Sequence, residues 1–372
     1  PGFISGHIVF GSVTGMGIPD WPLVPQPRNP GEIRRAYVFT TMADPFSRTP
    51  SPGGGGVIDY ANDGSTAWEF TIVSRPAAVA VYALAGLYDP NFDPDGEEGE
   101  EPPGVFQPFA MGVARGIIVG PAEEVKNVTV VVDMPLDTAV RVDLQNPPKL
   151  GVPAPDGPTE YYLRALVDLG GEGVIALPGS EANFLPGSFS AVLRGMAPIM
   201  TSIGDCSYTI ITGALTYGDW PFSMRIVRGI KDLSAPVEIG NFLGLPRAID
   251  PEPYGTVSAS HLQFEPDRTP ASEASSGPDG EATFIWHKLI MPPEQTMWTI
   301  IARGDQFDVP LPDVTEESGA WDFPTDDIWW VVYEATVPGL DFNNWSYRHL
   351  NPVYWSAYAI SYFTVRIPYP NI

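Results

Sequence analysis

Proline and glycine constrain the fold of this chain more than any other feature of its sequence. The 42 Pro and 38 Gly residues stand mainly in turns between short runs of β-branched and aromatic residues. Runs of this kind, bounded by turn residues, are typical of strands, and many short strands with Gly- and Pro-rich turns favour sandwiches or barrels. No window has a helical period with capping residues. We therefore predict an all-β fold built from Ig-like β-sandwiches.

The predicted strands form three series. The first comprises residues 6–13, 35–41, 66–73, 78–87, 114–120 and 126–136. The second comprises 138–144, 160–169, 173–177, 189–196, 207–218 and 222–230, and the third 255–265, 281–291, 297–304, 327–337 and 353–368. A chain of 372 residues is long enough for two or three domains. We predict tandem sandwiches over 1–136, 137–250 and 251–372, with a linker at 244–255 between the last two. One larger sandwich over 137–372 is the alternative.

Charge and cysteine content exclude several classes of protein. With 45 acidic against 20 basic residues, the net charge of −25 repels polyphosphates, so we predict no nucleic-acid partner. No apolar run is long enough to span a membrane. Cys206 is the sole cysteine, which excludes an intrachain disulfide and a multi-cysteine metal site. We interpret its thiol as a small buried apolar group rather than a nucleophile.

An acidic stretch, DPNFDPDGEEGEEPPG at 89–104, has the spacing of a calcium loop. Oxygen-bearing side chains stand at loop positions 1, 3, 5, 7, 9 and 12: Asp89, Asn91, Asp93, Asp95, Glu97 and Glu100. Calcium prefers six to eight hard oxygens. Pro94 replaces the glycine that a helix-flanked calcium loop needs, and the flanking runs are predicted strands. Two interpretations stay open: a calcium site in a β-loop, or a solvated acidic turn.

Aromatic residues are concentrated near the C-terminal end. Of the 10 Trp residues, seven lie from Trp286 onward. Exposed rings stack on sugars or anchor protein interfaces, whereas buried rings fill a core. Because side chains alternate along a strand, Trp329 and Trp330 should face opposite sides. The candidate binding residues are Trp329, Trp330, Trp345, Tyr347 and Trp355.

The motifs of common catalytic sites are missing from the sequence. The four histidines are scattered singly, without the spacing of a zinc hydrolase. No Gly-x-Ser-x-Gly nucleophile elbow occurs, and the glycine run at 53–56 lacks the Lys-Ser/Thr of a phosphate-binding loop. We predict a protein that is not an enzyme, with an unrecognised hydrolase left as an alternative.

Several short motifs in the first 135 residues suggest a family. They are GHIV at 6–9, AYVF at 36–39, the Asp63-Gly64 turn before Phe70, and KNVTVVVDMPL at 126–136. This block resembles the carboxypeptidase-regulatory-like, prealbumin-like β-sandwiches of exported bacterial proteins. The resemblance implies a non-catalytic stalk, spacer or adhesion module. With 16 Arg against 4 Lys, the whole chain looks like lipoproteins of high-GC, myxobacteria-like bacteria.

These expectations combine into one functional prediction. The chain begins with Pro1, which we interpret as a mature start after removal of an export signal, with a lipid anchor conceivable upstream. We expect a structural or binding component of an assembly in the periplasm or at the cell surface. Its expected partners are other envelope proteins or a second copy, and calcium is the cofactor if the acidic stretch is a metal site rather than a solvated turn. The alternatives are a carbohydrate-binding module that uses the C-terminal aromatic residues, and a hydrolase.

Overall fold

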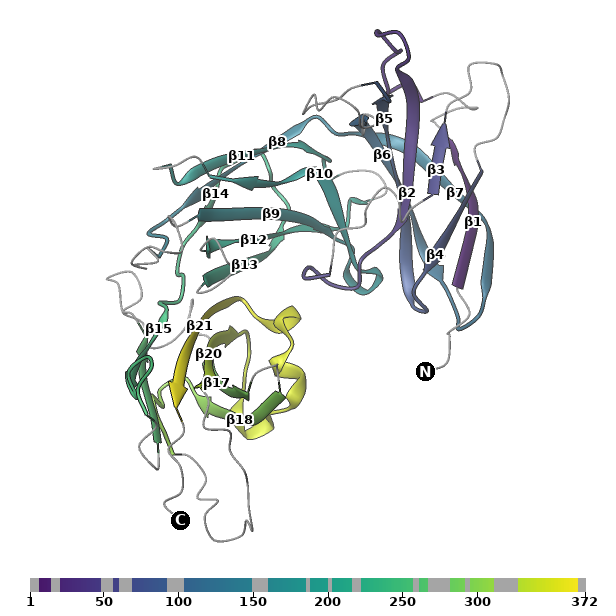
Figure 1. Cartoon of the computed structure of the whole chain (residues 1–372). Coiled ribbons are helices and arrows are strands. Elements are labelled where there is room, and N and C mark those ends of the chain that lie inside the picture. The colour runs from purple at the N-terminus through teal and green to yellow at the C-terminus, as the bar shows by residue number, and fades with distance from the viewer. Residues whose placement is uncertain are drawn as a thin grey trace.

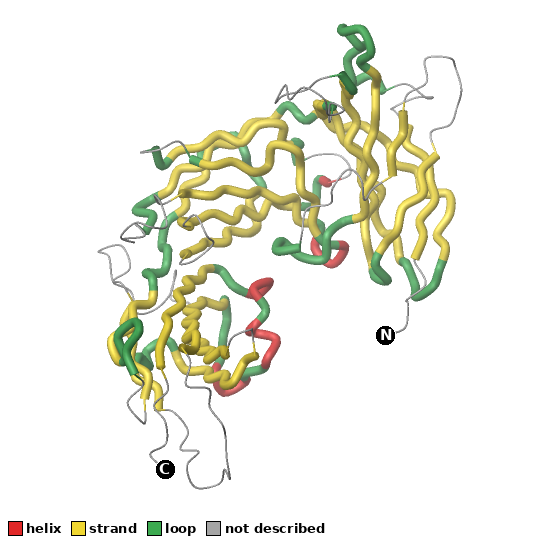
Figure 2. The backbone as a smooth tube through the Cα atoms, in the orientation of Figure 1, coloured by secondary structure: helices red, strands yellow, loops and turns green. Residues whose placement is uncertain are grey.

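The computed structural model describes residues 7–14, 21–47, 56–59, 69–91, 104–148, 160–184, 188–199, 203–215, 222–256, 261–266, 282–291, 295–310 and 327–366. In these ranges the chain is all-β, which confirms the predicted fold class (Figures 1 and 2). The helical elements described are short 3-10 turns: η2 (Gly170–Glu172), η5 (Phe342–Asn344), η6 (Tyr347–Leu350) and η7 (Pro352–Tyr354). Among the described residues, no helix has the length and apolar character required to cross a membrane.

The N-terminal part of the chain forms a seven-stranded sheet, here called the first unit. Its strands are β1 (His7–Thr14), β2 (Ile33–Thr40), β3 (Gly56–Asp59), β4 (Glu69–Ser74), β5 (Ala78–Asp89), β6 (Val105–Ile118) and β7 (Glu124–Pro135). They lie in the order β3-β2-β5-β6-β7-β1-β4, and the sheet curls around a core that includes Trp21 and Phe70. Strand β4 shows how the sequence produces this arrangement. Its residues alternate strictly between exposed and buried, so that Phe70 and Ile72 face the core.

Strand β5 is buried on both of its faces. Val81 and Ala83 point into the core of the first unit, whereas Tyr82 and Leu84 point into a second core. That second core also contains side chains from β9 and β12, described below. A strand covered on both faces reads as a continuous apolar run rather than an alternating one, which explains the sequence AAVAVYALAGL. The first unit therefore shares buried surface with the rest of the chain.

An eight-stranded sheet dominates the rest of the molecule. Its strands are β9 (Glu160–Asp168), β10 (Val174–Asn183), β12 (Ser207–Leu215), β13 (Phe222–Ile230), β17 (Ala282–Met291), β18 (Gln295–Arg303), β20 (Asp327–Val337) and β21 (Ala357–Arg366). The order is β10-β9-β12-β13-β21-β20-β17-β18. Residues 222–225 of β13 pair with 357–360 of β21. Strands from the second and third predicted blocks thus lie in one sheet; that residues 137–372 fold as one unit stays a prediction.

Two small sheets cover one face of the large sheet. They comprise β8 (Thr138–Leu144), β11 (Ser190–Met196) and β14 (Val237–Ile239), and β15 (Pro246–Asp250), β16 (His261–Pro266) and β19 (Asp308–Pro310). Val140 and Val142 of the first small sheet share a core with Leu163 and Ala165 of the large sheet. In the second, Phe264 packs in a core with Trp330. Each pairing is a sandwich of two apolar faces. The segment at 244–255, predicted as a linker, contains strand β15.

Figure 1 shows these parts as a curved array. The first unit lies at one end, the β8–β14 region in the middle and the β15–β21 region at the other end. The last strand, β21, returns to the middle of the large sheet between β13 and β20. It begins at Ala357, later than predicted, because the preceding Pro352–Tyr354 segment forms the turn η7.

Candidate functional site

The acidic stretch connects two paired strands. Asp89, the last residue of β5, pairs with Val105, the first residue of β6, so the two strands form a hairpin that residues 90–104 connect along the chain. The Asp89 Oδ1 atom accepts a hydrogen bond from the Asn91 backbone N–H at 3.0 Å. The other four candidate calcium ligands, Asp93, Asp95, Glu97 and Glu100, lie outside the described residues. In the part of the chain that the structure describes, no three His, Cys, Asp or Glu residues form a metal-binding group. The calcium site stays a prediction.

The five candidate aromatic residues differ in exposure. Tyr347 is 79% exposed and Trp329 is 38% exposed. Trp345 is half-buried and stacks on Phe342, with ring centroids 5.9 Å apart. In contrast, Trp330 and Trp355 are 0% and 1% exposed and lie in separate cores, where they cannot stack on a ligand from solvent. Of the five candidates, only Trp329, Trp345 and Tyr347 could therefore contribute to a surface that binds sugars.

Each of the two buried indoles among these candidates has a hydrogen-bond acceptor. The Trp330 Nε1–H donates to His287 Nδ1 at 3.2 Å, and the Trp355 Nε1–H donates to the His349 backbone carbonyl at 2.7 Å. A buried indole normally finds such a partner because its N–H is costly to leave unpaired. Burial lowers the pKa of His287 to about 4, so this imidazole is neutral at neutral pH. Both contacts lie within the buried cores.

A cluster of two rings and an ammonium group was not predicted from the sequence. Trp286 and Tyr333 lie opposite each other on β17 and β20 and stack, with ring centroids 4.8 Å apart. The Lys288 Nζ atom lies 3.8 Å from the centroid of the Trp286 ring. A cation at this distance from an aromatic face is attracted by the ring quadrupole. Lys288 shares its face with Trp286 because they are two residues apart on one strand, but only the strand register brings Tyr333 beside them.

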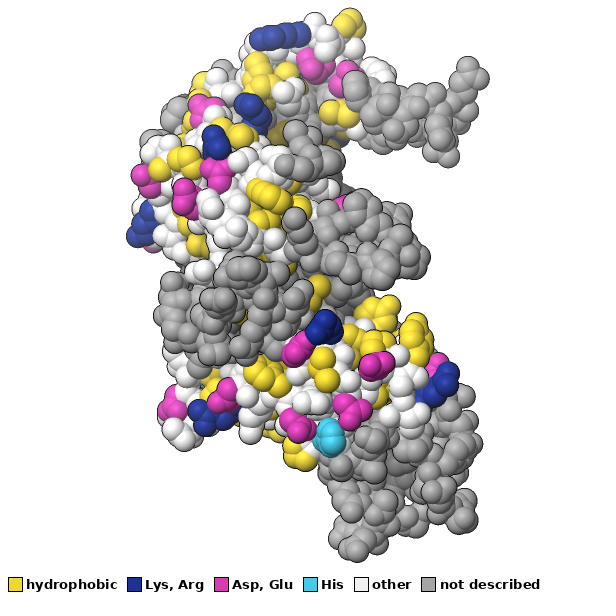
Figure 3. All heavy atoms as spheres, turned by 90° about the vertical axis from the view of Figure 1, so that its left-hand side faces the viewer, with side chains coloured by type: hydrophobic (Ala, Val, Ile, Leu, Met, Phe, Trp, Pro, Cys, Tyr) yellow, Lys and Arg dark blue, Asp and Glu magenta, His cyan; other side chains and the backbone are white. Residues whose placement is uncertain are grey.

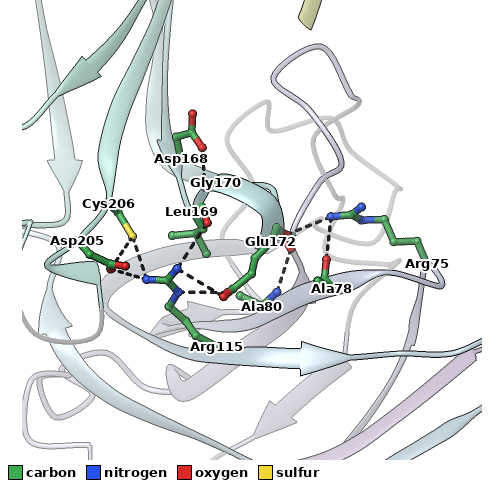
Figure 4. Close-up of polar contacts among 11 residues, drawn as sticks. Arg75, Ala78, Ala80, Arg115, Asp168, Leu169, Gly170, Glu172, Asp205 and Cys206 are labelled. Atoms are coloured by element: carbon green, nitrogen blue, oxygen red, sulfur yellow. Dashed lines mark hydrogen bonds and ion pairs between the residues drawn. The ribbon is translucent and has the colours of Figure 1, made fainter.

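The most extensive polar cluster described lies where the first unit meets the second core, and Figure 4 shows it in detail. Arg115 of β6 reaches across from the first unit. Its Nη1 atom lies 2.5 Å from Asp205 Oδ1, and its Nε atom lies 3.1 Å from Glu172 Oε2. The same guanidinium donates to the Leu169 carbonyl at 3.5 Å. Arg115 thus joins a strand of the first unit to two separate loops of the neighbouring region.

Further contacts fix the loop at η2 to the first unit. The Glu172 carbonyl accepts hydrogen bonds from Thr41 Oγ1 at 2.5 Å and from Arg75 Nη2 at 3.1 Å. Met42 and Val174 exchange two backbone hydrogen bonds, each of 3.0 Å. These polar contacts surround the shared apolar core to which Tyr82 and Leu84 belong. We call this combination of shared core and polar contacts the joint.

Cys206 lies within the joint. Its Sγ atom is 3.4 Å from Arg115 Nη1, and the residue is 4% exposed. Burial raises the pKa of the thiol to about 11, and the lowering effect of the Arg115 charge does not offset it. Since the thiolate is the nucleophilic form, this protonated and covered thiol is unsuited to covalent catalysis at neutral pH.

Surface charge is dispersed on the face shown in Figure 3. Acidic and basic side chains alternate there with apolar ones, and neither sign gathers into one broad patch on that face. Among the described residues, some exposed charges are paired, such as Arg141 with Asp143 at 3.0 Å and Arg366 with Asp327 at 2.8 Å. Such exposed pairs contribute little to stability.

Comparisons with known proteins add little. No family model matches the chain, and no curated protein matches it. Among the solved structures that match is the full-length RrgB pilus protein from Streptococcus pneumoniae, at 11% sequence identity, 96% coverage of this chain and a TM-score of 0.14. The chain spans 62% of the length of that protein. A likeness with so low a TM-score carries no argument about the fold or the function of this chain.

Proposed function

We propose that this chain is a non-catalytic structural or binding component of an assembly outside the cytoplasm. The joint is the observation that supports this most directly. Domains of one chain move relative to each other unless their interface is large and hydrophobic. Here Tyr82 and Leu84 of the first unit lie in the same buried core as Leu163 and Ile175, and Arg115 bridges the rim. A joint of this kind holds two β units at a fixed angle, as a spacer in an assembly requires.

The titratable groups support the non-catalytic part of the proposal. His287 is fully buried and paired with Trp330, and the Cys206 thiol is protonated at neutral pH. A general base must instead be able to reach a substrate and exchange a proton near the working pH. Neither group meets these requirements.

Location outside the cytoplasm can be tested in cells of the source organism. We expect protease added to intact cells, or to cells whose outer envelope is opened, to cleave this chain while a cytoplasmic marker stays whole. The net charge of −25 and the absence of any intrachain disulfide are compatible with such a location. Recovery of the chain with the cytoplasmic marker, protected from protease until the cells are lysed, would refute the location.

Calcium binding at residues 89–100 is a second part of the proposal. Binding to the folded state alone should raise the free energy of unfolding by about 2.7 kcal/mol when free calcium is a hundredfold above its dissociation constant. The measurement is a thermal melt with calcium and with chelator. Magnesium should substitute poorly, because it demands a compact octahedral site.

Two double variants sharpen the calcium test. Changing Asp93→Ala with Asp95→Ala should abolish the gain from calcium and leave the melting temperature in chelator almost unchanged. The matched control, Glu252→Ala with Asp305→Ala, removes two exposed carboxylates elsewhere and should keep the gain. An unchanged midpoint on adding calcium to the parent protein would reduce the stretch to an acidic turn.

A further inference from the structure

Edge strands of a sheet present unpaired backbone groups, and natural proteins usually protect them. Most edge strands that the structure describes carry such protection. Strands β3, β14 and β19 are only 4, 3 and 3 residues long, and β15 begins with Pro246. Strand β10 contains Pro178 and a register shift, and β11 contains Arg194 and a register shift. Short length, proline, charge and bulges all discourage pairing with another chain.

Strand β18 is a less protected edge of the large sheet. It is 9 residues long, and residues 295–302 include no charged residue, proline or glycine. A register shift against β17 leaves Met297 without an opposite residue. From Trp298 to Arg303 the register is regular, residue by residue. Both faces of this stretch carry apolar side chains, among them Trp298, Ile300 and Ile301.

The hydrogen bond made just after β18, at Gly304, shows which backbone N–H and C=O groups of β18 point toward β17. The Gly304 N–H donates to the Thr283 carbonyl at 2.8 Å, which extends the ladder between β18 and β17. The backbone N–H and C=O groups of successive residues point to alternate sides of a strand. Those of Ala302 and Ile300 therefore also point toward β17, whereas those of Ile301 and Thr299 point away from it. Arg303 points away too, and its N–H already donates to Gln306 Oε1 at 3.3 Å. Among the described residues, the outward groups of Thr299 and Ile301 have no backbone partner.

We propose that β18 pairs antiparallel with β18 of a second copy of this chain, about a twofold axis that passes beside Ile300. The two eight-stranded sheets then join into one continuous sheet. The proposal rests on the proposed function, because it names a second copy as a partner in the assembly. By contrast, β21, which carries apolar side chains on both of its faces, is paired on its two sides with β13 and β20.

The register between the two copies of β18 is limited at both ends of the stretch from Trp298 to Ala302. The bulge at Met297 limits one end, and the occupied N–H of Arg303 limits the other. The register centred on Ile300 places Thr299 opposite Ile301 of the second copy, so that each outward N–H meets an outward carbonyl. On the opposite face, Ile300 lies beside Ile300 of the second copy.

In this register the side chains of the two copies of β18 are also compatible with each other. Trp298 lies opposite Ala302 of the second copy, and Arg303 lies opposite Met297, so no charge faces a like charge. Cross-strand apolar pairs stabilise a sheet, and directly opposed like charges destabilise it. A charged partner strand would find no opposite charge between Gln295 and Ala302. The second copy therefore suits the edge better than an acidic or basic strand.

The net charge of −25 on each copy opposes association. Salt screens this repulsion, since the Debye length falls from about 10 Å at 0.1 M to about 3 Å at 1 M. Hydrogen bonds and apolar contacts along β18 are short-ranged and keep their strength. We expect dimerisation to strengthen as salt is added, opposite to the behaviour of an interface held by ion pairs.

A cysteine at residue 300 tests the register directly. Opposed residues in a non-hydrogen-bonded pair have Cα atoms about 4.5 Å apart, within the range that a disulfide spans. The Ile300→Cys variant should form a disulfide-linked dimer on mild oxidation. The Thr299→Cys variant should not, because its counterpart lies about 8 Å away, two residues along the neighbouring strand. The parent protein should stay uncrosslinked, since Cys206 is buried.

A proline at residue 299 tests the pairing independently. Thr299→Pro removes an outward N–H without removing a hydrogen bond to β17, and proline is tolerated on edges in that orientation. Light scattering should give the parent protein and the control Thr299→Ala twice the mass of the Thr299→Pro variant. Circular dichroism of the proline variant should match that of the parent.

Each outcome decides the proposal. A parent protein that is monomeric at high concentration and high salt would overturn it. Crosslinking at residue 299 equal to that at residue 300, or a dimer that survives Thr299→Pro, would also overturn it and would indicate another interface. Binding of β18 by a strand of a different protein, with the parent monomeric alone, counts against the second copy. Cellular location is measured separately, so a monomer at the cell surface refutes only this inference, and a cytoplasmic dimer refutes only the proposed function.

Discussion

Replacing Trp330 by alanine is expected to lower the free energy of unfolding by about 3–5 kcal/mol. Trp330 is 0% exposed and stacks with His287 in the core between the large sheet and the β15–β16–β19 sheet. Truncation leaves a cavity in a closely packed core, and the surrounding side chains relax only partially to fill it. It also removes the donor to His287 Nδ1, which would leave that buried nitrogen without its partner.

The neighbouring Trp329 provides the matched control. It is 38% exposed and lies on the opposite face of β20. The Trp329→Ala variant should lose less than about 1 kcal/mol, in the range of ordinary surface substitutions. Urea unfolding followed by circular dichroism measures both. Equal losses for the two variants would contradict the placement of these rings on opposite faces.

Replacing Tyr82 by alanine is expected to destabilise the first unit and the neighbouring region together, by about 3–5 kcal/mol. Tyr82 is 1% exposed and packs beside Phe39, with ring centroids 5.4 Å apart, in the shared core of the joint. Because side chains of both regions line this core, the cavity removes contacts from both. The unfolding transitions of the two regions should therefore move to lower urea concentration in step.

Limited proteolysis across a urea series can separate the two regions. Fragments from residues 7–135 and from residues 138–230 should become susceptible at the same urea concentration, in the parent and in Tyr82→Ala alike. Tyr347→Ala, a change at a tyrosine that is 79% exposed, should leave both transitions almost unchanged. Early cleavage of only one region in Tyr82→Ala would show that the joint does not couple them.

Local patterns account for the parts of the fold that could be predicted. Strand β4 alternates between buried and exposed residues, and β5 is a continuous apolar run, so each carries its own signal. The alternation rule correctly separated Trp329 from Trp330. Strands β14 and β19 were missed because 3 residues are too few to show a period. Strand β15 was mistaken for linker because its proline and its two charged residues resemble those of a turn.

The contacts of the joint could not be predicted, for a different reason. Arg115, Glu172 and Asp205 lie far apart in sequence, and each is an ordinary charged residue in its own segment. Only the packing of β6 against the β9–β12 region brings them together. Likewise, the acidic stretch at 89–104 was correctly placed between two strands, whereas its affinity for calcium depends on a loop geometry that residue spacing alone does not determine.

The position of β21 has a consequence for biosynthesis. This strand fills the gap between β13 and β20, so the large sheet stays divided into two halves until residues 357–366 have emerged from the ribosome. Pairings between segments so distant along the chain form slowly, and unpaired strands of an unfinished sheet are prone to aggregate. Until then, the backbone N–H and C=O groups of β13 and β20 that later pair with β21 have no partner strand. Its yield in a heterologous host should therefore depend on chaperones that shield those edges during translation.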